Sequence, residues 1–230
     1  MLSMPMPSFS RFAAALGLAL AALLPAARPA VAEVTLSFYT GYQTSPHSRF
    51  EGNDGTTDFS FLSEWEGRSF EMPPYYGVRA MVWRNENWGW GAEFTHAKVY
   101  ASDETLADNG LETLEMSDGI NILTANLMYR WPGQWAGGRI TPYVGGGLGV
   151  AIPHIEFQDD SGGPETFEYQ ITGPAARWIL GASYAINDTW SVFGELNGTY
   201  SSNKGDLEGG GEWESDIITN AINVGLTYSF

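Results

Sequence analysis

Three histidines are the residues of this chain best suited to acid–base or metal chemistry near neutral pH. His47 lies in the segment SPHSR, His96 lies in FTHAK, and His154 follows a proline. A lone surface histidine is usually only solvated, but imidazole beside carboxylate can bind a transition metal or transfer protons. The acidic and basic residues that the fold places beside these histidines therefore decide which chemistry is available.

The catalytic residues that we predict are His47, Glu71 and His96. Arg49 and Lys98 are predicted to bind substrate, because a guanidinium fork and an ammonium point charge both suit a sugar phosphate. The chain contains no nucleotide-binding fingerprint, so no nucleotide cofactor is expected.

A divalent or redox-active metal ion is predicted at His47, His96 and Glu66. Alternation along the two strands points His47 inward and His96 outward, so a loop or a bulge near Thr95 must bring them together. The outer ends of the first and third strands, with one strand between them, are expected about 10 Å apart.

The strand pattern that organises these residues is clearest in the last segment, Ile217–Phe230. Its even positions are mainly large and apolar, whereas its odd positions from Thr219 onward are small or polar. Such alternation gives a strand one apolar and one polar face. A segment that is apolar outward and polar inward is what a membrane barrel requires.

Seven similar segments precede it, joined alternately by long polar loops and short turns, which is the asymmetry of outer-membrane barrels. We therefore predict an all-β fold, an eight-stranded antiparallel transmembrane barrel with short periplasmic turns and long extracellular loops. Several tryptophans fall near the short turns, as an interfacial belt would. A soluble barrel of the lipocalin kind is the alternative. The expected strands are Val34–Gln43, Ser69–Arg84, Trp88–Tyr100, Asp118–Trp131, Ile140–Ile152, Pro174–Ile186, Trp190–Tyr200 and Ile217–Phe230.

Residues 1–32 have the features of an export signal. Arg11 precedes an apolar run, and Ala30-Val31-Ala32 forms a small-residue cleavage site. An uncleaved amphipathic anchor is the alternative, although Pro25 and Pro29 argue against it. We expect a cleaved signal peptide at 1–32 and a single barrel domain at 33–230.

Acidic residues dominate the predicted extracellular loops. The net charge is −16, and removal of residues 1–32 deletes two arginines and no acid, which leaves −18 and argues against nucleic acid as a partner. The four long loops and their flanks hold 22 of the 27 acids. So many acids at one end would repel phosphorylated lipid unless divalent cations bridge the two. The alternative is that these acids only keep the loops solvated.

The predicted lumen also carries charge. Arg79 faces inward and is expected to pair with Glu93 or Glu195 in a structural role. An eight-stranded barrel has a lumen filled by side chains, so we predict no diffusion pore.

Two resemblances give these patterns a functional direction. The C-terminal strand, with Tyr228 and Phe230, resembles the assembly signal of bacterial outer-membrane barrels, which implies recognition by the barrel assembly machinery. The segments LSFYTGYQTSPHSR (Leu36–Arg49), WEGRSFEMPPYY (Trp65–Tyr76) and EFTHAKVY (Glu93–Tyr100) resemble the lipid A oxidase family. That resemblance implies a monomeric outer-membrane enzyme that uses oxygen to convert the proximal glucosamine of lipid A, within lipopolysaccharide, to 2-aminogluconate.

Two other functions remain open. A lipid A deacylase of eight-stranded type has a His and a Ser two positions apart on one strand, a spacing that His47-Ser48 and His96-Ala97-Lys98 do not reproduce. A non-enzymatic surface barrel, with loops that bind ligands or shield the cell, satisfies the same strand pattern.

Overall fold

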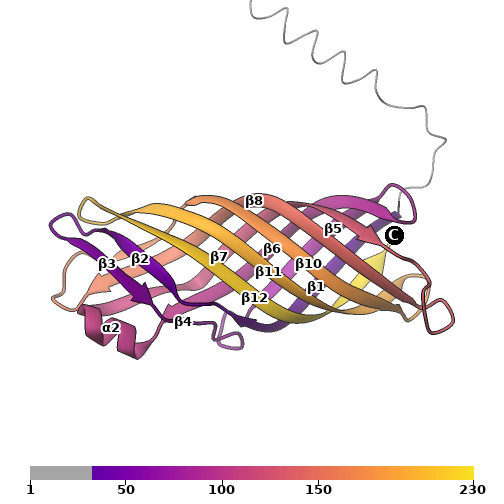
Figure 1. The fold of residues 1–230 in the computed structure, drawn as a ribbon, viewed down its shortest axis with the longest axis horizontal. Helices are drawn as coiled ribbons and strands as arrows, with labels where there is room; N and C mark the ends of the chain where they lie inside the picture. Colours follow the sequence, from indigo (N-terminus) through magenta and orange to yellow (C-terminus); the bar gives the residue numbers. More distant parts are fainter. Residues whose placement is uncertain (1–32) are drawn as a thin grey trace, which may run out of the picture. The chain divides into compact units, whose positions relative to one another are not determined.

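A computed structural model describes residues 33–230, and the predicted signal peptide lies outside this part of the chain. Eight antiparallel strands form a closed ring, which β1 and β12 complete by pairing from Thr35↔Ser229 to Thr44↔Asn220. Figure 1 shows these strands crossing at a tilt around the barrel. The ring consists, in order, of β1 (Glu33–Thr44), β5 (Tyr76–Trp83), β6 (Trp88–Ala101), β7 (Leu111–Arg130), β8 (Ile140–Asp159), β10 (Gly173–Ala185), β11 (Trp190–Leu207) and β12 (Gly211–Ser229).

Four short strands and one helix add to the ring at a single end. Strand β2 pairs with β12 and β3, β4 pairs with β6, and β9 pairs with β8. The connections at the opposite end are short, so the elaborated end is extracellular and the other is periplasmic. The added elements are β2 (Ser48–Asn53), β3 (Asp58–Ser63), β4 (Trp65–Glu66), β9 (Thr166–Tyr169) and α2 (Asp103–Asn109).

Large apolar side chains cover the outside of the barrel in a continuous band. On β1 the exposed row is Val34, Leu36, Phe38 and Tyr42, while the intervening side chains are buried in the lumen. Tryptophans and tyrosines gather at the periplasmic edge, where Trp88 packs on Tyr129 with ring centroids 4.7 Å apart. A band of this kind matches the hydrocarbon core, with an aromatic belt at the headgroups. Among the described residues, no helix is long and apolar enough to cross a membrane.

A buried charge network fills the lumen and confirms the predicted pairing of Arg79. Arg79 lies 2.7 Å from a carboxylate oxygen of Glu93 and 2.7 Å from one of Glu195. Arg177, which the sequence did not single out, lies 3.0 Å from Glu93. At least 96% of each of these four side chains is buried, so each charge is stabilised only by its partners.

Above the lipid-facing band the polarity of each strand reverses. On β12 the buried row continues through Ile217, Ser215 and Trp213, while Glu214 and Asp216 point to solvent. Phe50 and Trp213 stack with centroids 5.5 Å apart and belong to an aromatic core inside the extracellular end. The acid-rich segments therefore form strands with charged residues outward and apolar residues inward.

This reversal corrects the predicted boundaries. The expected loops 101–117, 153–173 and 201–216 are mostly strand, apart from α2 and short turns. The expected strand from Ser69 begins only at Tyr76. A strand whose apolar residues face inward can carry acids on its outer face, because that face contacts water and not lipid. Its acidic residues alone therefore do not distinguish such a strand from a polar loop.

Candidate functional site on the outer wall

Three neighbouring strands change from apolar to polar at the same height on the outside of the barrel. The lipid-facing row of β6 ends at Phe94 and continues with His96, and the row of β8 passes through Ile152 to His154. Between them, Asn121 of β7 pairs with both His96 and Ile152. We call His96, Asp118, Asn121, His154 and Glu156 the outer-wall cluster. It lies at the extracellular edge of the lipid-facing band.

A bulge in β7 gives the cluster its shape. The register shifts between Ala97 and Val99 on one side of β7, and between Glu115 and Ile120 on the other. The extra residues, which include Asp118, therefore protrude from the ladder beside the two histidines. The extra residues lie in β7 and not near Thr95 of β6, and they do not bring His47 to His96, contrary to the expectation from the sequence.

His96 is held in one orientation and keeps one ring nitrogen free. Its Nδ1 lies 2.9 Å from Oδ1 of Asn121, and its ring stacks on Tyr76 with centroids 5.2 Å apart. Only 5% of the residue is exposed, and its buried Nε2 has no hydrogen-bond partner. Because the Asn121 oxygen accepts, Nδ1 carries the proton and Nε2 presents a lone pair, which is the state of a base or a metal ligand.

His154 is equally constrained on β8. Phe167 and Tyr169 of β9 contact its ring edge to face, with centroids 4.4 and 4.6 Å away. Its Nδ1 lies 3.3 Å from a carboxylate oxygen of Glu156 but does not have hydrogen-bond geometry. One ligand atom each from Asp118, His154 and Glu156 lies within 4.8 Å of the other two.

Two cations lie near His96, and one of them, Lys98, follows it two positions along β6. The Lys98 ammonium lies 5.1 Å from the centre of the Tyr100 ring, and the Arg68 guanidinium lies 4.5 Å from it. Lys98 also donates a 3.2 Å hydrogen bond to the backbone oxygen of Glu71, which ties β6 to the segment before β5. Arg68 pairs with Glu66 at 2.9 Å. The cations are thus fixed by packing rather than free in solvent.

Acidic groups set the electrostatics above the band. Burial lowers the pKa of the Lys98 ammonium, although the neighbouring carboxylates of Glu71, Glu115 and Asp118 oppose that shift. Burial also raises the pKa of the Glu115 carboxyl, and the nearby Glu156 carboxylate acts in the same direction. The carboxylates therefore favour positive charge at this surface, whereas burial opposes it.

A groove on the outside of the barrel runs beside these cations. It has a volume of about 580 Å³ and lies between the upper end of β1 and the segment 65–71. Tyr42, Phe70 and Glu71 are exposed along it, and Arg68 lines it. The groove offers a lipid both apolar and charged surface at the edge of the membrane.

The predicted site residues fall into two groups. Glu66, Glu71, His96 and Lys98 do gather around β6, through the contacts described above. His47 is exposed, and its Nδ1 lies 3.7 Å from Glu64, which bonds to the residue that follows β6. That residue is six positions beyond His96, a distance of about 20 Å along a strand. His47 therefore does not converge on His96, and the expected three-ligand set with Glu66 does not form.

Arg49 is also separated from the cluster. Its Nη1 donates a 2.8 Å hydrogen bond to Ser60, and it lines a groove with Lys204 and Glu214 on the β12 side. In the ring, β1 and β5 lie between β12 and β6. The chain after β1 turns toward β12. The order of the strands in the sequence does not indicate this turn.

Sequence reasoning missed Asp118, Asn121 and Glu156, and gave His154 no role. The signal for two of them was present, since His154 and Glu156 continue the outward row of β8 by strict alternation. Asp118 could not be found in this way, because the bulge moves it out of register.

Gly119→Ala is expected to displace His96 while the barrel remains folded. Gly119 has φ +107°, and a Cβ there would lie 2.3 Å from Nδ1 of His96. Gly162→Ala is the matched control, because Gly162 has φ +77° with open space around it. Each variant carries the left-handed backbone cost of about 1–2 kcal/mol. The His96 imidazole resonances in NMR should shift only in Gly119→Ala, and unchanged resonances would contradict this packing.

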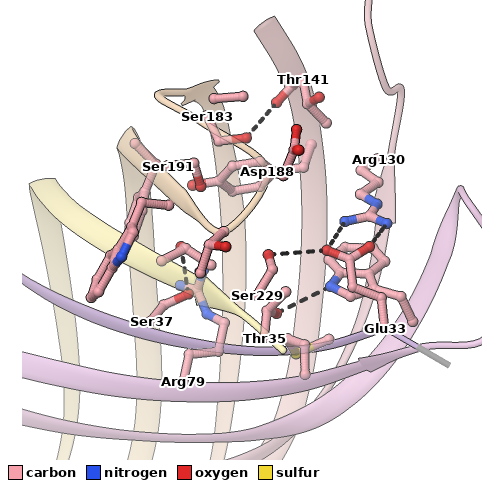
Figure 2. A pocket seen from close by; sticks show the side chains of 18 of the residues that line it. Glu33, Thr35, Ser37, Arg79, Arg130, Thr141, Ser183, Asp188, Ser191 and Ser229 are labelled. Atoms are coloured by element: carbon pink, nitrogen blue, oxygen red, sulfur yellow. Dashed lines mark hydrogen bonds and ion pairs between the residues drawn. The ribbon is translucent and has the colours of Figure 1, made fainter. Parts of the chain in front are cut away.

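The periplasmic end contains a cavity that differs in character. It has a volume of about 290 Å³ and reaches Arg79, and serines and threonines are among the residues that line it (Figure 2). At its side, Arg130 pairs with Glu33, which also accepts a 3.2 Å hydrogen bond from Ser229. Thr35 accepts a 3.1 Å hydrogen bond from Trp83. The three histidines lie at the other end of the barrel, so no imidazole of residues 33–230 lines this cavity.

The closed ring, the apolar band and the aromatic belt together define a transmembrane β-barrel of the bacterial outer membrane. The chain belongs to the outer membrane protein beta-barrel domain family, whose model matches residues 13–230. No curated protein sequence matches it.

Three solved structures are similar to this chain at low sequence identity. Neisserial surface protein A is 12% identical, with a TM-score of 0.49 over 86% of this chain and 97% of that one. AlkL is 15% identical, with a TM-score of 0.46 over 90% and 95%. OprG from Pseudomonas aeruginosa is 13% identical, with a TM-score of 0.40 over 86% and 95%.

Proposed function

We propose that this barrel binds the phosphorylated sugar headgroup of an outer-leaflet lipid at the outer-wall cluster and modifies it there. The observation that carries the proposal is the position of His96. Its free, buried Nε2 lies on the outside of the barrel, directly beyond the lipid-facing band. A ligand that approaches from the membrane meets the outer wall at this imidazole without passing through the lumen, and a small side-chain movement would expose the buried Nε2 to it.

The specific reaction that we propose is oxidation of lipid A. All three segments that resemble the lipid A oxidase family lie at or beside the groove between β1 and residues 65–71. Residues 42–45 of the first and 65–71 of the second line the groove, and the third contains His96 and Lys98. Lys98 in turn bonds to Glu71 within the second segment.

The oxidation balances as follows for a glucosamine whose anomeric hydroxyl is free of phosphate. Two electrons and two protons leave the hemiacetal to give a lactone, and oxygen accepts them as hydrogen peroxide. Water then opens the lactone to the acid, so the lipid gains one oxygen atom in total. We propose that Nε2 of His96, which has no partner, accepts the hydroxyl proton. A side chain can serve as this base. Transfer of the two electrons to oxygen needs a redox-active group, such as a metal ion, which side chains do not provide.

A non-enzymatic surface barrel is the second candidate. The observation that favours it is the ring of outward acids above the membrane, which includes Glu212, Glu214 and Asp216 on β12. Such a surface suits cation binding or shielding of the cell, without chemistry on a lipid.

The mass spectrum of lipid A from cells with and without the chain separates these functions. The oxidase adds one oxygen atom to a fraction of the lipid only when the chain and oxygen are both present. A deacylase would instead remove an acyl chain. An unchanged spectrum would contradict both enzymatic functions and favour the non-enzymatic barrel.

A further inference from the structure

We propose that Asp118, His154 and Glu156 form a binding site for one divalent transition-metal ion on the outer wall of the barrel. The site uses neither His47 nor Glu66, and it lies beside His96 rather than around it. Metal binding itself does not depend on the proposed reaction, although its consequence for a lipid does.

The three side chains already face one another. One donor atom from each lies within 4.8 Å of the other two, as two carboxylates and one imidazole. An ion with bonds of about 2.1 Å holds its ligands up to about 4.2 Å apart, so small side-chain rotations complete the set. The three ligands come from the β7 bulge and from alternate positions of β8, which keeps two of them on a rigid strand.

The buried imidazole supplies an independent reason to expect a ligand. His154 is only 4% exposed, and its Nδ1 has no hydrogen-bond partner despite lying 3.3 Å from Glu156. A buried polar atom is rarely left without a partner. A metal ion between the nitrogen and the carboxylate would satisfy both atoms.

Neighbouring groups hold the ligands in place. Ser117 donates a 2.6 Å hydrogen bond to Glu156, and the Tyr169 hydroxyl donates a 3.2 Å bond to the backbone oxygen of Asp118. Phe167 and Tyr169 fix the plane of the His154 ring. Contacts of this kind orient metal ligands and raise affinity.

The charge around the site also favours a cation. Glu115 lies directly opposite Glu156 across the β7–β8 ladder, so two like charges face each other beside the site. The nearest fixed cations, Lys98 and Arg68, already contact Tyr100. A divalent ion at this place would offset the excess negative charge.

The donor set indicates the class of ion and of ligand. One imidazole with two carboxylates suits Mn²⁺, Fe²⁺, Co²⁺ or Zn²⁺, whereas Mg²⁺ and Ca²⁺ prefer oxygen donors alone. With three protein ligands, the ion retains open positions toward the outside of the barrel. We infer that a phosphate or hydroxyl of an outer-leaflet sugar headgroup takes one of them, next to Nε2 of His96.

Cobalt binding to the purified, chelator-treated full-length barrel tests the site. Co²⁺ is titrated in excess Mg²⁺, and its visible absorption reports ligation by nitrogen and oxygen. We expect one Co²⁺ per barrel, displaced by Zn²⁺ but not by Ca²⁺. His154→Gln and Glu156→Gln should each weaken binding at least about tenfold, the lower end of losses seen at metal sites.

His47→Gln is the matched control, because His47 also lies beside a glutamate, 3.7 Å from Glu64, but on an exposed loop. It should bind Co²⁺ as the unaltered protein does. Heat-modifiable migration on a gel confirms that each variant keeps its barrel. Binding that survives His154→Gln, or that Ca²⁺ displaces, would overturn the site and assign the ion to the acidic surface. A barrel that binds Co²⁺ but leaves lipid A unchanged would retain the metal site and contradict only the proposed oxidation.

Discussion

Glu93→Ala should destabilise the barrel by about 3–5 kcal/mol, the usual cost of removing one partner from a buried ion network. Glu93 accepts from both Arg79 and Arg177 in the lumen, and its side chain is fully buried. Its removal leaves two guanidinium groups with fewer partners and no access to bulk water. Urea unfolding of the barrel in lipid vesicles measures the change.

Glu212→Ala is the control for that experiment. Glu212 also forms a short ion pair, 2.8 Å from Lys204, but more than half of both side chains is exposed. An exposed pair contributes about 0–1 kcal/mol, so this variant should unfold almost as the unaltered protein does. Equal stability of the two variants would contradict the view that the lumen network holds the barrel together.

His96→Ala should lower lipid A oxidation by about a hundredfold or more, the range for loss of a general base. The expected effect follows from its free Nε2 and from its orientation by Asn121. The rate at which lipid A gains one oxygen atom, measured with the purified barrel, reports the change. Urea unfolding of the same variant separates a loss of chemistry from a loss of fold.

His47→Ala provides the matched comparison, because it removes the same side chain from an exposed loop position. His47 contacts Glu64, which bonds to Ser102, six positions beyond His96, so the loss of His47 should leave the rate unchanged. If His47→Ala reduced oxidation as strongly as His96→Ala, the active site would lie in the loops instead of on the outer wall.

The sequence was sufficient to predict the ring of eight strands, because a lipid-facing strand must show apolar residues at every second position. Val34, Leu36 and Phe38 display that period without interruption. The sequence-based prediction was wrong above the membrane, where Glu214 and Asp216 lie on the outer face of a strand and not in a loop. The deciding information there is the inward row of Trp213 and Ile217, which a count of acids does not register.

The candidate site was predictable only in part. His96 and Lys98 follow from position on their strand, and Lys98 bonds to Glu71, which lines the groove. The place of His47 depends on how the loop after β1 folds over β12, which is a tertiary contact. Asp118 depends on a bulge whose extra residues local pattern does not reveal.

The central claim, that a lipid headgroup binds the outer-wall cluster, is tested most directly by photocrosslinking in native membranes. A benzophenone amino acid replaces Ile171, which is exposed beside the part of β8 that leads to His154, or Ile218, which is exposed on β12 across the outer wall. Crosslinked peptides are then examined by mass spectrometry for lipid A. Adducts should form well above background at position 171 and only at background at position 218. Equal labelling of the two positions, or none at position 171, would contradict a specific lipid site at this cluster.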